Sequence, residues 1–440
     1  MTAATKRLSL AVAVGVAALT VAACALVAPS GAASEPAGTR APQAATPAAP
    51  VTTAILTGPA DAAIGRYGTR TSATFAVVAQ GSRLTYAWQQ RAGSSGTWKA
   101  IAKATKSTYV AKAATWKSGT QFRVVVRGSL GSATSAPATL TVLLPTKTPA
   151  RDAETAFGLT GLRQGVDMSA YQYTPAGRVK TSAIAAWAGT DGFALLRNGS
   201  GARPIRQSYT EACTNKTKKT GAKPVTQDCA YAVLADKLSA GKLSLGHYWF
   251  NGWIDAIDTT KADLFAGGYT PAASARQFVT WLKRDGHYTT SSTDPLVLDV
   301  EKGHAWTKTS KGKTYTVKLR AWRPAEAAEF LTTVKSLLTR DGYHANLYVY
   351  MSANATMKVD PDTGSFVWTP VAGIARLWVA SWGTNNGRIP QSLPKVGPWE
   401  GYDGWSIWQY TSNARIAGDG LPGGLDADIA TADAWTPRAP

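Results

Sequence analysis

The sequence is poor in cysteine and histidine. Its 440 residues include 3 Cys and 4 His, and no Cys-x-x-Cys pair occurs. The histidines are scattered without the spacing that metal ligands need. They are His247, His287, His304 and His344. We therefore expect no metal site.

Acidic residues are also scarce. Charged residues make up 17% of the chain. The chain has 47 Lys and Arg and 27 Asp and Glu, which gives a formal net charge of +20. This excess favours an acidic partner, either nucleic acid, anionic lipid or an acidic surface polymer, and does not choose among them. A hydrophobic content of 45%, with 16 Trp, 16 Tyr and 9 Phe, excludes a disordered or collagen-like chain. The length predicts two or three folded units.

Residues 1–33 have the pattern of a secretory signal. Lys6 and Arg7 precede an uncharged apolar run from Leu8 to about Ala28, and small residues follow. A signal anchor is the alternative, although the run is rich in Ala. Val21-Ala22-Ala23-Cys24 also resembles a bacterial lipobox, so a released form and a form lipid-anchored through Cys24 both remain open. We expect a secreted protein.

Two cysteines remain beyond the signal. Cys213 and Cys229 are an even number in an exported chain, and we expect them to form a disulfide. In the chain-entropy model, a crosslink over a loop of this length stabilises the fold by about 3 kcal/mol.

The N-terminal half contains a linker and a β-rich segment. Residues 34–50 are rich in Ala and Pro and predict a linker. From 51 to 145, short alternating runs separated by Gly and Ser turns predict a small all-β sandwich. With Trp88 in LTYAWQQ and the later run QFRVVV, it resembles bacterial immunoglobulin-like domains. Residues 51–150 contain 12 Lys and Arg, and Asp61 is their only acidic residue. This excess indicates either a solvated surface or adhesion to anionic wall polymers.

Residues 146–160 predict a second linker, and strand-like and helix-like segments alternate after it. Apolar runs predict strands at 163–168, 193–197, 243–250, 296–301, 346–351, 376–382 and 405–410, with a short one near Leu425. Helices are expected at 182–188, 230–240, 271–284 and 324–340. This alternation over 161–440 implies a parallel sheet, most economically an irregular β/α barrel of the TIM type.

The end of the expected strand 296–301 has the sharpest chemical signal. Asp299 and Glu301 are two residues apart, so in a strand both side chains project from one face. At the C-terminal end of a barrel strand, that face is the active-site mouth. Glycoside hydrolysis needs one carboxyl group to protonate the leaving oxygen and a second to steer water, a nucleophile or the substrate's acetamido group. Solvated acids at a strand end are the competing interpretation.

Two further acids are expected at the same mouth. Asp167 ends the first barrel strand and Asp426 lies near the last, and these two strands are neighbours in a closed barrel. Aromatic residues also gather at strand ends, where core packing explains many and a sugar-stacking platform uses two or three. The candidates for substrate binding are Tyr171, Tyr248, Trp249, Tyr348, Trp382 and Trp408.

The ordered motifs of this segment resemble those of glycoside hydrolase family 25, the secreted muramidases. They are GVDMSAYQ, GHYWF, LVLDVE, LWVASWG and WSIWQY followed by LDAD, between about Gly161 and the C-terminus. The resemblance implies cleavage of the β-1,4 bond between N-acetylmuramic acid and N-acetylglucosamine in peptidoglycan, without a cofactor. Carried over by motif, Glu301 is the general acid, Asp299 its partner, and Asp167 and Asp426 the remaining acidic wall. We expect the enzyme to be a monomer.

Two positions depart from the family's pattern. The second strand usually ends in Lys-x-Thr/Ser-Glu-Gly, whereas Arg197-Asn198-Gly199-Ser200-Gly201 lacks the Glu. Tyr173 replaces the small residue usual after Gln172. Both lie near the expected cleft and bear on subsite preference and rate. The extra stretch 203–228, which holds the expected disulfide, is a candidate loop over that cleft.

Other mechanisms and functions remain as alternatives. We favour Glu301 as acid with Asp299 orienting the acetamido group, while covalent and inverting routes stay open. A family 18 chitinase also ends a strand in Asp-x-Glu, but its signature needs an Asp where this chain has Val297. A wall-binding adhesin whose barrel has lost activity is the rival from another class. A specific nucleic-acid binder is not expected, because only the charge suggests one.

Overall fold

The structure is a computed structural model, and the part described here comprises 51–173, 179–201, 227–251, 254–256, 270–302, 306–310, 312–319 and 321–438. The predicted signal and first linker lie outside these residues. Cys213 does too, so its disulfide with Cys229 stays a prediction, as does a loop formed by 203–228. No helix within the described ranges is both long and apolar enough to cross a bilayer.

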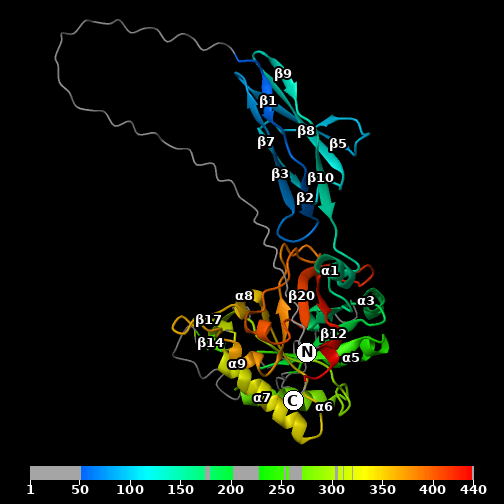
Figure 1. The fold of residues 1–440 in the computed structure, drawn as a ribbon, viewed down its shortest axis with the longest axis vertical. Coiled ribbons are helices and arrows are strands. Elements are labelled where there is room, and N and C mark those ends of the chain that lie inside the picture. Colours follow the sequence, from blue (N-terminus) through cyan, green and yellow to red (C-terminus); the bar gives the residue numbers. More distant parts are fainter. Residues whose placement is uncertain are drawn as a thin grey trace, which may run out of the picture. The chain divides into compact units, whose positions relative to one another are not determined.

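The first folded part, called the β-module below, comprises residues 51–145 (Figure 1). Its largest sheet has the order β2-β10-β8-β5-β6, with β9 beside β8, and two small sheets pair β1 with β4 and β3 with β7. Only β2 and β10 pair in parallel. The strands are β1 (Ala54–Thr57), β2 (Ala62–Gly65), β3 (Ser72–Ala76), β4 (Val78–Gln80), β5 (Thr85–Ala92), β6 (Lys99–Ala100), β7 (Thr108–Lys112), β8 (Thr120–Gly128), β9 (Gly131–Thr134) and β10 (Ala138–Leu143).

Strict alternation along β8 gives the β-module its core. Phe122, Val124 and Val126 are fully buried, while the residues between them face outward. The Phe122 ring lies 4.8 Å from that of Phe75 on β3, so the β3-β7 sheet covers the inner face of the large sheet. An all-β module is therefore present at the predicted residues, and its immunoglobulin-like assignment stays a prediction.

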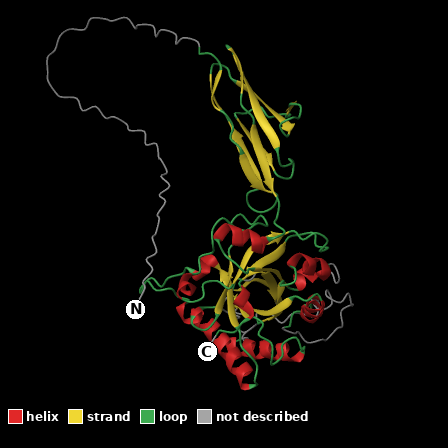
Figure 2. Ribbon diagram, turned by 45° about the vertical axis from the view of Figure 1, so that its right-hand side comes forward, coloured by secondary structure: helices red, strands yellow, loops and turns green. Residues whose placement is uncertain are grey.

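The second part is a closed barrel with the strand order β11-β12-β13-β15-β18-β19-β20-β21. Figure 2 shows these strands as a ring with helices around it. They are β11 (Arg163–Met168), β12 (Phe193–Ser200), β13 (Ser244–Phe250), β15 (Leu296–Asp299), β18 (Leu347–Ser352), β19 (Arg376–Ala380), β20 (Ile407–Ala414) and β21 (Leu425–Ala430). Each lies at or within a few residues of its predicted position.

The last strand corrects the prediction of a parallel sheet. The pairs from β11 through β20 are parallel, whereas β21 is antiparallel to both β20 and β11. Residues 415–424 connect β20 to β21 without a helix. Because a parallel pair needs a long crossover, this short connection reverses the chain direction.

Helices cover the outside of the barrel. They are α1 (Pro149–Phe157), α2 (Ala170–Tyr173), α3 (Thr181–Ala188), α5 (Tyr231–Ala240), α6 (Pro271–Arg284), α7 (Pro324–Arg340), α8 (Ala353–Thr356) and α9 (Thr369–Ala372), with the 3-10 turns η2 (Gly397–Gly401) and η3 (Ala432–Trp435). The four predicted helices are confirmed as α3, α5, α6 and α7. A three-stranded sheet of β14 (Ile254–Ala256), β17 (Lys313–Leu319) and β16 (Trp306–Ser310) was not predicted.

Helix α1 lies within the predicted second linker, 146–160, so that prediction is wrong for its middle. Pro149 occupies the first turn, and Gly158 ends the helix in a left-handed conformation with φ 67°. Ala150 and Ala153 are buried against the barrel core. The small side chains that suggested a linker instead allow close packing.

The barrel strands alternate between two cores. One inner cluster includes Leu195, Val297 and Trp378, which point into the ring. Their neighbours Leu196 and Leu298 belong to a larger cluster shared with the surrounding helices. This alternation decides which side chains can reach the barrel mouth.

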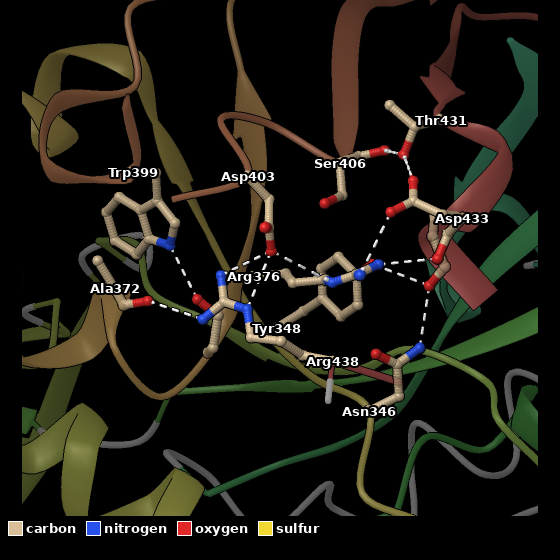
Figure 3. A network of polar contacts seen from close by, with 12 residues as sticks. Asn346, Tyr348, Ala372, Arg376, Trp399, Asp403, Ser406, Thr431, Asp433 and Arg438 are labelled. Carbon is tan, nitrogen blue, oxygen red and sulfur yellow. Dashed lines mark hydrogen bonds and ion pairs between the residues drawn. The ribbon is translucent and has the colours of Figure 1, made fainter. Parts of the chain in front are cut away.

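The C-terminal segment closes the N-terminal end of the strands. Tyr348 donates from its hydroxyl to the Ala434 carbonyl (2.8 Å), and Arg376 donates to the Asp433 carbonyl (2.8 Å). Figure 3 shows this network, in which Asp403 lies near both Arg376 (3.6 Å) and Arg438 (2.8 Å). Since this end is filled, the open mouth is at the opposite, C-terminal end of the parallel strands.

Candidate active site

Carboxyl groups from three strands converge on the mouth. Asp167 on β11 and Asp426 on β21 are direct register partners, and Asp299 ends β15. Because β21 is antiparallel, its first residues, not its last, lie at this end. Glu301 follows two residues after Asp299 and is exposed, and its charge acts on both Asp299 and Asp426. The structure thus brings together the four acids predicted as catalytic.

A fifth acid, Asp428, lies deeper on the inner face of β21. It is fully buried, and its Oδ1 accepts a hydrogen bond from Nε1 of Trp378 (2.8 Å). Burial raises the pKa of Asp428, and the nearby Asp426 raises it further. Its spacing of two residues from Asp426 was a signal in the sequence for a second inward acid, and the prediction missed it.

Asp167 is buried close to two other acids of the mouth. Burial raises the pKa of Asp167 well above its usual range, and the charges of Asp426 and Asp428 raise it further. Gln409 of β20, also missed by the prediction, donates from Nε2 to Asp167 Oδ2 (2.6 Å). The side-chain oxygen Oε1 of Gln409 accepts hydrogen bonds from the Tyr350 hydroxyl (2.9 Å) and from Nε1 of Trp382 (2.8 Å). These bonds fix the orientation of the Gln409 side-chain amide.

Asp299 has an oxygen available for a ligand. It is 6% exposed, and its buried Oδ1 has no hydrogen-bond partner among the described residues. Burial raises the pKa of Asp299 well above its usual range; Glu301 adds to this and Arg197 opposes it. Asp426 is partly exposed, and burial together with the charge of Glu301 raises its pKa to about 7.

Arg197 brings positive charge to the mouth from the altered second-strand motif. Its Nη2 and Nε both lie 2.7 Å from Asp228 Oδ2, and its guanidinium lies 5.8 Å from the Tyr171 ring centroid. Asp228 is 2% exposed and also accepts bonds from the backbone N–H groups of Ala170 (3.2 Å) and Ala230 (2.9 Å). The Asp228 carboxylate therefore orients Arg197 and the backbone at Ala170 and Ala230.

Asn251 fixes the backbone that carries Glu301. Its Nδ2 donates to the Glu301 carbonyl (2.9 Å), and its Oδ1 accepts from the Trp322 N–H (2.7 Å). Its own N–H donates to the Asp299 carbonyl (3.0 Å). Asn251 is fully buried. No motif in the sequence singled it out, because its role depends on contacts with residues far along the chain.

Three of the six predicted aromatic residues lie at the mouth. Tyr171 is 67% exposed beside Arg197, and Trp382 is 37% exposed beside Gln409. Tyr248 belongs to the inner cluster, where burial and the charge of Asp167 raise its pKa. A substrate-binding role for these three residues stays a prediction.

The other three aromatic residues lie away from the mouth, contrary to the prediction. Trp249 faces outward from β13, is fully buried and packs on Phe278 of α6, with ring centroids 5.8 Å apart. Trp408 also faces outward and donates from Nε1 to the Ser381 carbonyl (2.9 Å). Tyr348 points inward but lies at the closed end. The sequence placed all three near strand ends without resolving which face or which end.

Comparison with known proteins gives a family match to part of the chain. Residues 263–419 match the model of glycosyl hydrolases family 25, a range that includes Asp299 and Glu301. The search of curated proteins gave no match.

Within the described residues, no group of three or more His, Cys, Asp and Glu side chains is arranged to hold a metal ion.

Several solved structures are similar to this chain. One is a glycosyl hydrolase 25 of Streptococcus pneumoniae, at 18% identity over 61% of this chain and 87% of that chain (TM-score 0.37). Another is a lysozyme from Streptomyces coelicolor, at 19% identity over 60% and 90% (TM-score 0.36). A family 25 lysozyme from Aspergillus fumigatus is 14% identical over 61% and 94% (TM-score 0.34). On the family match, this chain contains a glycosyl hydrolases family 25 domain, and the protein is a glycoside hydrolase.

Proposed function

We propose that the protein is a muramidase that cleaves the β-1,4 bond between N-acetylmuramic acid and N-acetylglucosamine in peptidoglycan. The observation that carries this is the meeting of Asp299 and Glu301 with Asp167 and Asp426 at one barrel mouth. Glycoside hydrolysis requires a proton donor and a second carboxyl group on the substrate. The family match supports a peptidoglycan hydrolase of this class.

Glu301 is the general acid in this proposal. It is exposed at the mouth, where a glycosidic oxygen can approach it, and Asn251 holds its backbone. Glu301 donates its proton to the leaving oxygen while the bond from that oxygen to C1 of the sugar breaks. The resulting carboxylate then takes a proton from the water that completes hydrolysis.

Asp299 assists through the substrate's acetamido group. Its buried Oδ1 has no partner among the described residues and is free to accept the acetamido N–H. The acetamido carbonyl oxygen attacks C1, and the positive charge that develops on the group is stabilised by the ionised form of Asp299, which the charge of Arg197 favours. Water then attacks C1 from the face that the leaving group vacated while the bond between C1 and the acetamido oxygen breaks, so the product retains its configuration.

Asp167 and Asp426 supply hydrogen bonds with little additional negative charge. Burial raises the pKa of both, to about 7 for Asp426, and this direction favours their protonated forms. A protonated carboxyl group donates to a sugar hydroxyl, whereas four ionised carboxylates at one mouth would repel each other. Trp382, exposed beside Gln409, provides a ring for stacking on a sugar.

The proposal includes export and wall association. The sequence pattern of residues 1–33 supports secretion, and the charge of the β-module supports binding to anionic wall polymers. The released and lipid-anchored forms are distinguished by the mass of the mature N-terminus.

The test is release of reducing ends from purified insoluble peptidoglycan, with products identified by mass spectrometry. The parent protein should release muropeptides ending in N-acetylmuramic acid, and Glu301→Gln should lose this activity. Glu329→Gln, which removes an exposed carboxylate on α7, is the matched control and should remain active. Binding to several wall types without release by the parent would instead support the adhesin alternative. Inversion at C1, seen by NMR of the first products, would refute the role given to Asp299.

A further inference from the structure

The outer face of the β-module contains a cluster of two arginines and a tryptophan that glycoside hydrolysis does not use. Arg91 is on β5, Arg123 is on β8, and Trp98 directly precedes β6. The guanidinium carbons of Arg91 and Arg123 lie 4.6 Å and 4.2 Å from the centroid of the Trp98 ring. All three side chains are partly exposed. We call these residues the Arg-Trp cluster.

A glutamine side chain holds each of the two guanidinium groups in place. Nε of Arg91 donates to Oε1 of Gln121 (2.9 Å), and Nε of Arg123 donates to Oε1 of Gln89 (2.8 Å). These contacts follow from the strand register, which places Arg91 opposite Gln121 and Gln89 opposite Arg123. The Gln121 amide is fixed in turn by donating to Oγ1 of Thr139 (3.2 Å).

The terminal nitrogens of both arginines remain available. Within the described residues, neither Arg91 nor Arg123 forms an ion pair, and the hydrogen bonds of both side chains use Nε. Asp61 is the only acidic residue in 51–145, and its Oδ1 accepts from the Thr139 N–H and forms no ion pair with either arginine. Two like charges against one ring repel each other, and an anion that contacts both removes this repulsion.

The geometry also indicates which kind of anion fits. A guanidinium with Nε engaged presents its two terminal nitrogens as a fork that matches the oxygens of a phosphate group. Both arginines lie against the ring of Trp98, which leaves less of this ring for the stacking of nucleic-acid bases. Polar neighbours such as Gln89, Gln121 and Thr139 do not form an apolar surface for insertion into lipid.

We propose that the Arg-Trp cluster is a binding site for a linear phosphodiester polymer of the cell wall. The two arginines contact phosphate groups of one polymer segment, and Trp98 keeps their forks aligned. This deepens the wall association proposed above by naming its site and ligand chemistry. It does not depend on the muramidase chemistry of the barrel.

Titration of the full mature protein with poly(glycerol phosphate), followed by calorimetry, tests the site. Arg91→Gln combined with Arg123→Gln should weaken binding by at least about tenfold, as expected for the loss of charge-assisted contacts. Arg91→Lys with Arg123→Lys keeps the charge and loses the fork, and it should weaken binding almost as much. Lys112→Gln with Lys117→Gln removes the same charge from exposed positions elsewhere on the module and should change binding less than about threefold.

Three outcomes would overturn the proposal. They are equal weakening in the two glutamine double variants, unchanged binding in the arginine variants, and binding of double-stranded DNA as tight as that of the polymer. An unchanged thermal midpoint shows that each variant is folded. Activity of the same variants on soluble peptidoglycan fragments should equal that of the parent, which separates failure of this site from failure of the proposed muramidase.

Discussion

Asp426 at the barrel mouth makes the stability of the barrel depend on pH. Burial and the charge of Glu301 raise its pKa from 3.8 to about 7. In the unfolded chain the same carboxyl group ionises near pH 4. Between these two values the unfolded state has released a proton that the folded state still holds, so the free energy of unfolding falls as the pH rises. The contribution of Asp426 to stability is therefore most favourable below about pH 4, and its loss is complete above about pH 7.

The magnitude follows from the size of the shift. One pKa unit corresponds to about 1.4 kcal/mol, so this shift corresponds to at most about 4 kcal/mol. Because the side chain is partly exposed, solvent screening reduces this value. Asp426→Asn keeps the shape and removes the charge. We expect it to stabilise the protein by about 1 to 3 kcal/mol more at pH 8 than at pH 4, relative to the parent.

Guanidinium denaturation followed by tryptophan fluorescence between pH 4 and pH 8 measures this difference. Only Trp88, Trp98 and Trp116 of the 16 tryptophans lie in the β-module, so the signal reports mainly on the barrel. Asp362→Asn removes an exposed carboxylate that is not one of the acids of the mouth and should leave the profile unchanged. A stability difference between Asp426→Asn and the parent that is the same at both pH values would refute the reasoning.

Other substitutions separate positioning, binding and packing. Asn251→Ala leaves the Glu301 carbonyl and the Trp322 N–H without their partner, so kcat should fall by about tenfold or more while KM changes little, in steady-state assays of muropeptide release. A parallel rise of KM would contradict this positioning role. Trp382→Ala should raise KM and leave the thermal midpoint unchanged. Trp249→Ala should instead lower the free energy of unfolding by about 3 to 5 kcal/mol, because it opens a cavity against α6. Equal destabilisation by the two tryptophan variants would show that Trp382 is also a packing residue.

The sequence predicted the barrel strands well because each has an unusually clear signal. In LVLDVE, an apolar run of strand length ends in acids, and Pro271 and Pro324 mark the starts of α6 and α7. Strand direction has no comparable signal. The reversal of β21 depends on the absence of a helix in 415–424, and a loop-rich sequence there was compatible with either direction.

The acids of the site were predictable, and their supporting residues were not. Asp299 and Glu301 can be recognised in the sequence because they are two residues apart at a strand end, and this spacing is a local property. Gln409 and Asn251 are polar residues beside aromatic ones, and only the closed barrel brings them to Asp167 and Glu301. Aromatic residues such as Trp249 and Tyr348 mislead for the same reason, since a residue's face and depth are set by tertiary packing.

The altered second-strand motif places a charged pair at the mouth of the barrel. Where the family pattern has a Glu, this chain has Ser200, and the strand register is irregular between Arg197 and Gly199. Arg197 nevertheless has a buried carboxylate partner, because Asp228 reaches it from the start of α5. A buried cation without such a partner would be strongly destabilising. The charge opposing the raised pKa of Asp299 is therefore held in place, and the missing Glu alone gives no ground for inferring an inactive barrel.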